Sequence, residues 1–244
     1  MRTITVSVFA LVASVLVPAS AVAQMTWTDK GYVSVSVGAQ AGSHTLTTAP
    51  AFRLYDEDGS LTTSQKVGGG GFFDLSGGYK VWRNMLVAVG VSHSGSSKDI
   101  AITAQVPDPA DFDRLRSVNA ALPGAKHSEN AVHFSAVWMV PVTDKIDVGI
   151  SAGPSIFMVK QTLATGLAIS EPGPTVTGVV SAKSNKSAGG VNLGVDVTYL
   201  LTKNKKIGAG VLARYTGGSV KLPDAAKSLT VGGFQFGVGV RYRF

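Results

Sequence analysis

Cysteine is absent from the 244 residues of the sequence. No disulfide can therefore stabilise the fold, and thiolate chemistry, whether catalytic or metal-binding, is excluded. Charged residues are sparse, at 15% of the chain, and after residue 23 no run of apolar residues reaches 18. The sequence therefore predicts no transmembrane helix in this part, and stability must come from burial and strand pairing.

The first 23 residues differ in character from the rest. Arg2 is their only charge, an apolar run follows, and Ala21-Val22-Ala23 closes the segment with small residues. This pattern predicts an exported protein with a signal peptide (1–23) that is cleaved after Ala23. A membrane-anchoring helix is the alternative, although the apolar run is short for it. Residues 24–244 are predicted to form one β-barrel domain.

The remaining charge is only moderately basic. Without Arg2, 21 basic and 15 acidic side chains give a net charge of +6. Lys203, Lys205 and Lys206 form a local group and do not belong to a longer basic stripe. We therefore expect no nucleic-acid partner for this exported chain.

Alternation of apolar and polar residues is the dominant pattern. Near the N-terminus, Val33, Val35 and Val37 alternate with Ser34 and Ser36. Because successive side chains of a strand point to opposite sides, each such segment has one apolar and one polar face. Eight segments follow this pattern, at 31–41, 72–81, 85–94, 131–140, 146–157, 191–199, 207–216 and 231–244. Each is about ten residues long, which suits a membrane-crossing strand.

The connections alternate in length. Short polar links join the second strand to the third, the fourth to the fifth, and the sixth to the seventh, at 82–84, 141–145 and 201–206. Long segments join the others, and we expect loops at 42–71, 95–130, 158–190 and 217–230, with a short helical turn at 111–119. Short turns at one end and long loops at the other are typical of an outer-membrane barrel.

The two faces could be oriented in either sense. In a soluble barrel the valines would point inward. However, the polar face is rich in Gly, Ala and Ser, and an eight-stranded interior has room only for packed side chains. Aromatic residues of the apolar face also gather toward strand ends, as in interfacial girdles; these are Tyr79, Trp138, Tyr199, Tyr215, Tyr242 and Phe244. We predict an all-β, eight-stranded antiparallel up-and-down transmembrane barrel with its apolar face toward lipid.

The C-terminal stretch GVGVRYRF ends this alternation on an aromatic residue. With the signal peptide and the eight strands, it resembles the small bacterial outer-membrane β-barrels, whose members include outer-membrane proteins A, X and W. The resemblance covers nearly all of the mature chain. It implies the cell outer membrane as location, lipid as surroundings, and an assembly signal read by the barrel assembly machinery; Val238, Val240, Tyr242 and Phe244 match that signal.

Charged and titratable residues occur on the predicted lumen face. They are Asp74, Lys80, His133, Asp147, Asp196, Arg214, Arg241 and Arg243. An unpaired charge in a narrow lumen is costly, so we expect these groups to pair. A lumen charge network that holds the barrel closed is the favoured interpretation, because barrels of eight strands lack an aqueous channel. A gated path for ions, or a narrow pore for small or apolar solutes, is the alternative.

His133 and Ser135 suggest one enzymatic alternative. They share a face two residues apart, and lipid A deacylases of this barrel class carry a His-x-Ser pair with His as base and Ser as nucleophile. No strand supplies an obvious acidic partner, since Glu57 and Glu129 fall in predicted loops. We therefore expect no enzyme and no catalytic residue, and an inward His133 bonded to a neighbour.

Two glycine patterns and two acidic runs predict no cofactor or metal. GAGVLA (208–213) matches a dinucleotide pattern, but no helix follows, and GGGG (68–71) lacks the lysine of a P-loop. DEDG (56–59) and DPADFD (108–113) supply too few oxygens for calcium and indicate solvated turns. The predicted role is structural or surface-interacting, through long outer loops that bind an external ligand, in a protein that we expect to be monomeric.

Overall fold

The computed structural model describes residues 26–244, so the predicted signal peptide lies outside the described part. These residues form an all-β structure, and no helix in residues 26–244 is long and apolar enough to span a membrane. The strands are β1 (Gly31–Ala41), β2 (His44–Thr48), β3 (Ala51–Leu54), β4 (Glu57–Val67), β5 (Gly70–Trp82), β6 (Met85–Pro107), β7 (Leu115–Thr143), β8 (Ile146–Ser170), β9 (Thr175–Leu200), β10 (Ile207–Val220) and β11 (Leu229–Arg243).

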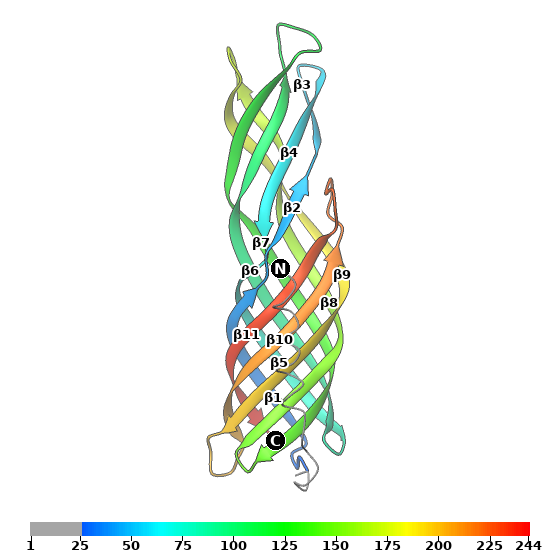
Figure 1. Ribbon diagram of the computed structural model, residues 1–244, viewed down its shortest axis with the longest axis vertical. Coiled ribbons are helices and arrows are strands. Elements are labelled where there is room, and N and C mark those ends of the chain that lie inside the picture. Colours follow the sequence, from blue (N-terminus) through cyan, green and yellow to red (C-terminus); the bar gives the residue numbers. More distant parts are fainter. Residues whose placement is uncertain (1–25) are drawn as a thin grey trace, which may run out of the picture.

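Eight of these strands form a closed ring. The order around the ring is β1, β5, β6, β7, β8, β9, β10 and β11, and all pairs are antiparallel. The first and last strands close it, with Val35 opposite Val240 and Val37 opposite Val238. Figure 1 shows the result as a long tube with oblique strands. A closed ring leaves no unpaired strand edge, which lets it cross a lipid phase.

The apolar face is on the outside, as predicted. Val37, Val89 and Val238 are about half exposed, whereas Ser36 and Asp74 are buried in the lumen. Every ring strand contributes apolar side chains to this outer surface, which forms a continuous band. Exposure of this apolar band to water would be strongly unfavourable without a partner surface to cover it. Lipid is therefore the medium that fits it. The fold is an eight-stranded transmembrane β-barrel.

Glycines of the lumen face make room for aromatic rings. Phe72 points inward, and a Cβ on Gly237 would lie 2.8 Å from its Cζ atom. Phe157 also points inward, and a Cβ on Gly190 would lie 2.6 Å from its Cε2 atom. Glycine is otherwise unfavourable within a strand, and the narrow interior provides the compensating reason for it.

The short turns agree with the sequence, as does most of the loop predicted at 217–230, which spans 221–228, but the other three long loops do not. β5 and β6 are joined by Arg83 and Asn84 alone. In contrast, most of 95–130 and 158–190 continues the flanking strands, and 42–71 contains β2, β3 and β4. The expected helical turn at 111–119 is also wrong, because β7 begins at Leu115. The strands continue past the apolar band because pairing with a neighbouring strand satisfies their backbone N–H and C=O groups.

The strands that protrude beyond the band form an extension, which we define as residues 44–67, 96–128 and 159–189. In Figure 1 it continues the tube beyond one end of the ring, with β3 and β4 at its side. β4 pairs with the upper part of β6, and β2 pairs with β4. β7 has 29 residues, or roughly 95 Å of strand at ~3.3 Å per residue, far more than a bilayer requires.

The polarity of the two faces is reversed in the extension. On β6, the inward residues change from Ser92 and Ser94 to Ile100 and Ile102, while the outward residues change from Val91 to Thr103. The enclosed apolar side chains form a core of their own, which includes Leu61, Val106, Val118 and Leu167. Water surrounds this part, so its apolar side chains turn inward, whereas in the ring they face lipid.

Candidate functional site

Three acid–arginine pairs occupy the lumen of the ring. The carboxylates are nearly inaccessible to solvent, and each lies within hydrogen-bonding distance of a guanidinium group. The pairs, with their N–O distances, are Asp74–Arg214 at 2.7 Å, Asp147–Arg243 at 2.8 Å and Asp196–Arg241 at 2.6 Å. Each pair joins strands that are not neighbours in the ring, so the side chains brace the lumen from within.

A hydrogen-bonded chain continues from Arg214 toward the extension. Its side chains are nearly all buried, and each contacts the next at 2.7–3.2 Å. In order, the members are Arg214, Gln235, Gln40, Glu129, His127, Gln161 and Gln65. Gly232 adds a backbone donor, since its positive φ of 87° turns its N–H toward Glu129, at 2.9 Å. The carboxylate of Glu129 is thus fully enclosed by donors, which makes its burial tolerable.

His133 and Ser135 do not form a pair. The two ring nitrogens of His133 lie 2.9 Å from the hydroxyl of Ser92 and 2.7 Å from that of Ser155. Ser135 donates instead to Asn192, at 2.9 Å. The inward His133 is bonded to neighbouring side chains, and both of its nitrogens are occupied by hydroxyls.

The chain that precedes β1 enters the short-turn end of the barrel. Trp27 is 0% exposed, and its backbone N–H donates to Asn84 at 3.0 Å. Lys80 pairs with no carboxylate of residues 26–244 but donates from Nζ to the carbonyl of Trp27, at 3.0 Å. Asp29 is paired with Arg243 and, at 2.5 Å, with Lys206. Apolar lumen residues pack around the indole, namely Tyr32, Leu86, Ala88, Val137 and Met139.

A small polar cavity remains between the side chains around Trp27 and the hydrogen-bonded chain that begins at Arg214. Its volume is about 60 Å³, which is enough for a few water molecules. Ser34, Ser36 and Asn192 contribute to its lining. The side chains at either end, from Trp27 to Arg214, are almost completely buried. The lumen is therefore filled with side chains at both ends of this cavity.

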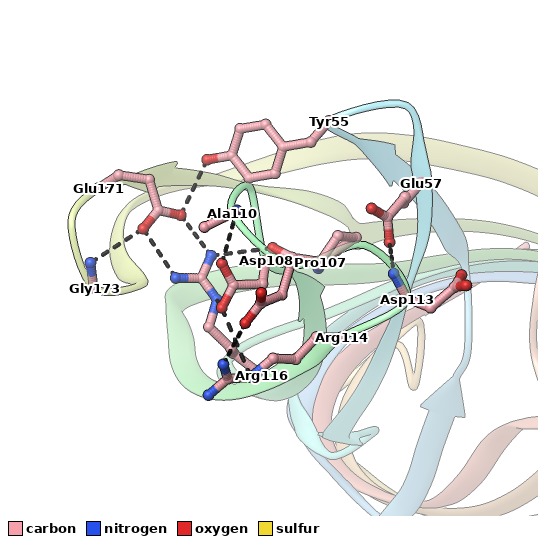
Figure 2. Close-up of polar contacts among 11 residues, drawn as sticks. Tyr55, Glu57, Pro107, Asp108, Ala110, Asp113, Arg114, Arg116, Glu171 and Gly173 are labelled. Atoms are coloured by element: carbon pink, nitrogen blue, oxygen red, sulfur yellow. Dashed lines mark hydrogen bonds and ion pairs between the residues drawn. The ribbon is translucent and has the colours of Figure 1, made fainter.

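At the far end of the extension, three connecting segments are tied together (Figure 2). Arg116 on β7 donates to both carboxylate oxygens of Glu171 in the β8–β9 turn, at 2.6 and 2.9 Å. Tyr55 of the β3–β4 turn donates to the same carboxylate at 3.1 Å. Arg116 also lies 3.6 Å from Asp108 of the β6–β7 turn. We call Tyr55, Asp108, Arg116 and Glu171 the tip cluster.

The tip cluster alters the ionisation of its members. Hydrogen bonds from Arg116 hold the pKa of Glu171 below its usual value. Partial loss of solvent, followed by the hydrogen bond to Glu171, raises the pKa of Tyr55. Glu171 is thus an anion and Tyr55 a neutral donor at neutral pH, which are the forms that the contacts require.

A groove of about 360 Å³ adjoins the tip cluster. Phe112 on its rim is 79% exposed, an unusual state for an apolar ring, and Leu115 beside it is also exposed. The charged lining consists of Arg53, which is paired with Asp58 at 3.4 Å, and of the carboxylates of Asp56, Glu57 and Asp113, for which no ion pair is seen in residues 26–244. The groove thus combines negative charge with an apolar edge. In residues 26–244 no group of His, Asp and Glu has the arrangement of a metal site.

The C-terminal residues of β11 face outward along the band. Val238, Val240, Tyr242 and Phe244 are all exposed, and the rings of Tyr242 and Phe244 stack with centroids 6.4 Å apart. The carbonyl of Phe244 accepts hydrogen bonds from Lys30 and Gly31, at 2.6 and 3.1 Å. The last residue is therefore fixed by its backbone to the start of β1.

Sequence reasoning missed two of these features. Trp27 was not singled out, although a tryptophan just before the first strand was visible. The tip cluster is also absent from the sequence-based prediction, because the pattern predicts loops for its segments. The signal for the extension was the alternation in Ile100-Ala101-Ile102-Thr103, which continues past the end of the predicted strand in the opposite sense.

Comparison with known proteins finds resemblance only at the level of structure. No family model and no curated protein matches the sequence. Neisserial surface protein A matches with 12% identity over 88% of this chain and 97% of its own, at a TM-score of 0.44. Outer membrane protein OprG of Pseudomonas aeruginosa matches with 9% identity over 88% and 97%, at 0.42. The outer membrane protease OmpT of Escherichia coli matches with 11% identity over 90% and 98%, at 0.49. The proteins to which this chain is similar are thus outer-membrane β-barrels, and at such identities the similarity concerns the fold alone.

Proposed function

We propose that the protein is an outer-membrane surface-interaction protein. Its short-turn end faces the periplasm, the ring anchors it, and the extension carries the tip cluster and its groove away from the cell surface. The observation that carries the proposal is the groove itself, where exposed Phe112 and Leu115 adjoin three carboxylates that form no ion pair with a described residue.

The extension supports this role because it is rigid. It has an apolar core of its own, and the β6–β7 and β8–β9 pairs run from the ring to the turns with a few register shifts. The tip cluster then fixes three turns relative to one another through Arg116 and Glu171. A surface held in one geometry before binding loses less conformational entropy when a partner docks.

The chemistry of the groove favours a cationic partner with an apolar portion. Asp56, Glu57 and Asp113 attract positive charge, and the face of Phe112 attracts both alkyl chains and cations. A lysine- or arginine-containing segment of an external protein has both properties.

Binding to simple cationic surfaces provides the test. The protein in phosphatidylcholine nanodiscs is passed over immobilised poly-L-lysine and poly-L-glutamate. We expect retention on poly-L-lysine only, and roughly fivefold weaker retention for Asp56→Asn with Asp113→Asn, from ~1 kcal/mol of exposed charge attraction. Asp144→Asn, which removes an exposed charge at the opposite end, is the matched control. Equal retention of all variants would reject the proposal.

The filled lumen supports a role without conduction. We expect no discrete conductance steps when the purified protein is inserted into a planar bilayer; steady steps would favour the alternative of a narrow pore. We also propose that the protein is not an enzyme. The acyl pattern of lipid A in producing cells should then be the same for the native protein and for His133→Ala, as mass spectrometry would measure.

A further inference from the structure

Exposed charge is uneven along the barrel axis, with Asp99 and Asp224 as exposed carboxylates in a region that is otherwise rich in lysine. Lysines lie between the apolar band and the acidic tip, and none of them forms an ion pair with a described residue. They are exposed, and they come from four ring strands, from β4 and from the β10–β11 connection. The lysines are Lys66, Lys98, Lys126, Lys160, Lys183, Lys186, Lys221 and Lys227.

Three of these lysines lie together on neighbouring strands. Lys160 on β8 is opposite Ser128 on β7 and Asn185 on β9. Lys126 lies two residues from Ser128, and Lys183 lies two residues from Asn185, all on the outward face. Lys160 is therefore a diagonal neighbour of Lys183, with Cα atoms roughly 7–8 Å apart, and lies near Lys126, which is one residue beyond the last paired position of β7 and β8. We call Lys126, Lys160 and Lys183 the lysine triad.

No carboxylate offsets the triad on its own strands. The acidic residues of β7, β8 and β9 are Glu129, Asp147 and Asp196, and all three side chains turn into the interior. On these three strands the outward oxygen-bearing side chains beside the triad are neutral, such as Ser128 and Thr162, and the nearby carboxylate of Asp99 on β6 accepts a hydrogen bond from the backbone of Gly124. Three ammonium groups thus repel one another at the surface, and a bound anion would remove this repulsion.

The triad adjoins the apolar band directly. Met158 lies two residues before Lys160 on the same face of β8 and is exposed to lipid, as is Ile156 before it. A lysine two residues beyond lipid-facing methionine has its ammonium group at the level of lipid headgroups, with its alkyl stem along the band. The position selects a ligand that has both a buried acyl part and an anionic head.

We propose that the lysine triad binds the phosphate of a lipid headgroup in the adjoining leaflet and so holds one lipid against β7, β8 and β9. The phosphate accepts charge-assisted hydrogen bonds from the three lysines, and the acyl chains of the same lipid cover Met158 and Ile156. This site does not depend on the proposed function of the groove, which lies at the end of the extension.

Native mass spectrometry of the detergent-solubilised protein can test the site. The probes are phosphatidic acid, which carries a phosphate monoester, and phosphatidylcholine, which is zwitterionic. We expect one tightly retained phosphatidic acid per barrel, with an apparent affinity reduced tenfold or more in the variant K126Q/K160Q/K183Q. The matched control K145Q/K203Q/K205Q removes three exposed lysines at the short-turn end and should retain the lipid as the native protein does.

Each other outcome would overturn the proposal. Equal retention of phosphatidylcholine would mean that the phosphate monoester is not recognised. Equal loss in both triple variants would mean a general effect of net charge. Displacement of phosphatidic acid by inorganic phosphate at similar concentration would mean a site for free anions and not for a lipid. The heat-modifiable electrophoretic shift of a folded barrel verifies that both triple variants fold.

Discussion

Arg214 on β10 donates to Asp74 on β5 across the lumen, with 2.7 Å between Nη2 and Oδ2, although 140 residues separate them in the chain. Two strands, β11 and β1, stand between β10 and β5 in the ring. The pair therefore links two strands that share no backbone hydrogen bonds with each other. It also starts the hydrogen-bonded chain that reaches Gln65 in the extension.

Loss of this pair should destabilise the barrel strongly. Asp74→Asn leaves the buried Arg214 without its counter-charge, and we expect the free energy of unfolding to fall by about 3–5 kcal/mol. Urea unfolding in phosphatidylcholine vesicles measures it. The matched control is Asp144→Asn, because Asp144 pairs with Lys205 at 3.4 Å on the exposed surface and should cost less than about 1 kcal/mol. Similar losses in both variants would contradict a bracing role.

The indole of Trp27 should contribute to stability by filling the short-turn end. Trp27→Ala removes a fully buried ring from the cluster around Leu86 and Met139, and we expect a loss of about 3–5 kcal/mol in unfolding free energy. Trp82→Ala is the matched control, since Trp82 faces outward at the same end and is 56% exposed. Equal stability of Trp27→Ala and the native protein would show that the segment before β1 occupies the lumen without stabilising the barrel.

The tip cluster should open in acid. The pKa of Glu171 is lowered in the folded protein, so its contribution is present above the usual carboxyl pKa and is lost as the pH falls through the folded value. The pKa of Tyr55 is raised, so its contribution is present at neutral pH and is lost as the pH rises through its folded value. Protection from hydrogen exchange at residues 107–116, taken relative to the intrinsic exchange rate at each pH, should therefore be greatest between these limits. The acid limb should disappear in Glu171→Gln, and its persistence there would assign it to another group.

Phe244 should matter for assembly in cells more than for stability. Phe244→Ala keeps the backbone carbonyl that accepts from Lys30 and Gly31 but removes the outward ring. We expect several-fold less heat-modifiable, folded barrel in membranes of producing cells, and unchanged refolding of the purified chain in detergent. Phe234→Ala, which removes a lipid-facing ring higher on the same strand, is the control. A defect in both settings would indicate a packing role alone.

Local pattern was enough to predict the ring. Each strand shows its two faces through a period of two residues, and Val238, Val240 and Tyr242 carry that signal without reference to any other segment. The same period continues through Ile100 and Ile102, but there the outward side chains are polar and the inward ones apolar. A strand that is defined by outward apolar residues therefore ends before Ile100, whereas β6 continues to Pro107. The boundary between lipid and water decided which sense was correct.

The sequence by itself determined the strands of the ring, their short turns, and the face that each presents to lipid, because these depend on residues one or two positions apart. Three contacts became visible only in the folded protein. Asp74 pairs with Arg214, Trp27 lies in the lumen, and Arg116 on β7 pairs with Glu171 in the β8–β9 turn. These contacts link residues from 55 to 140 positions apart. Their partners depend on the stagger of strands around a closed ring, which no single strand encodes.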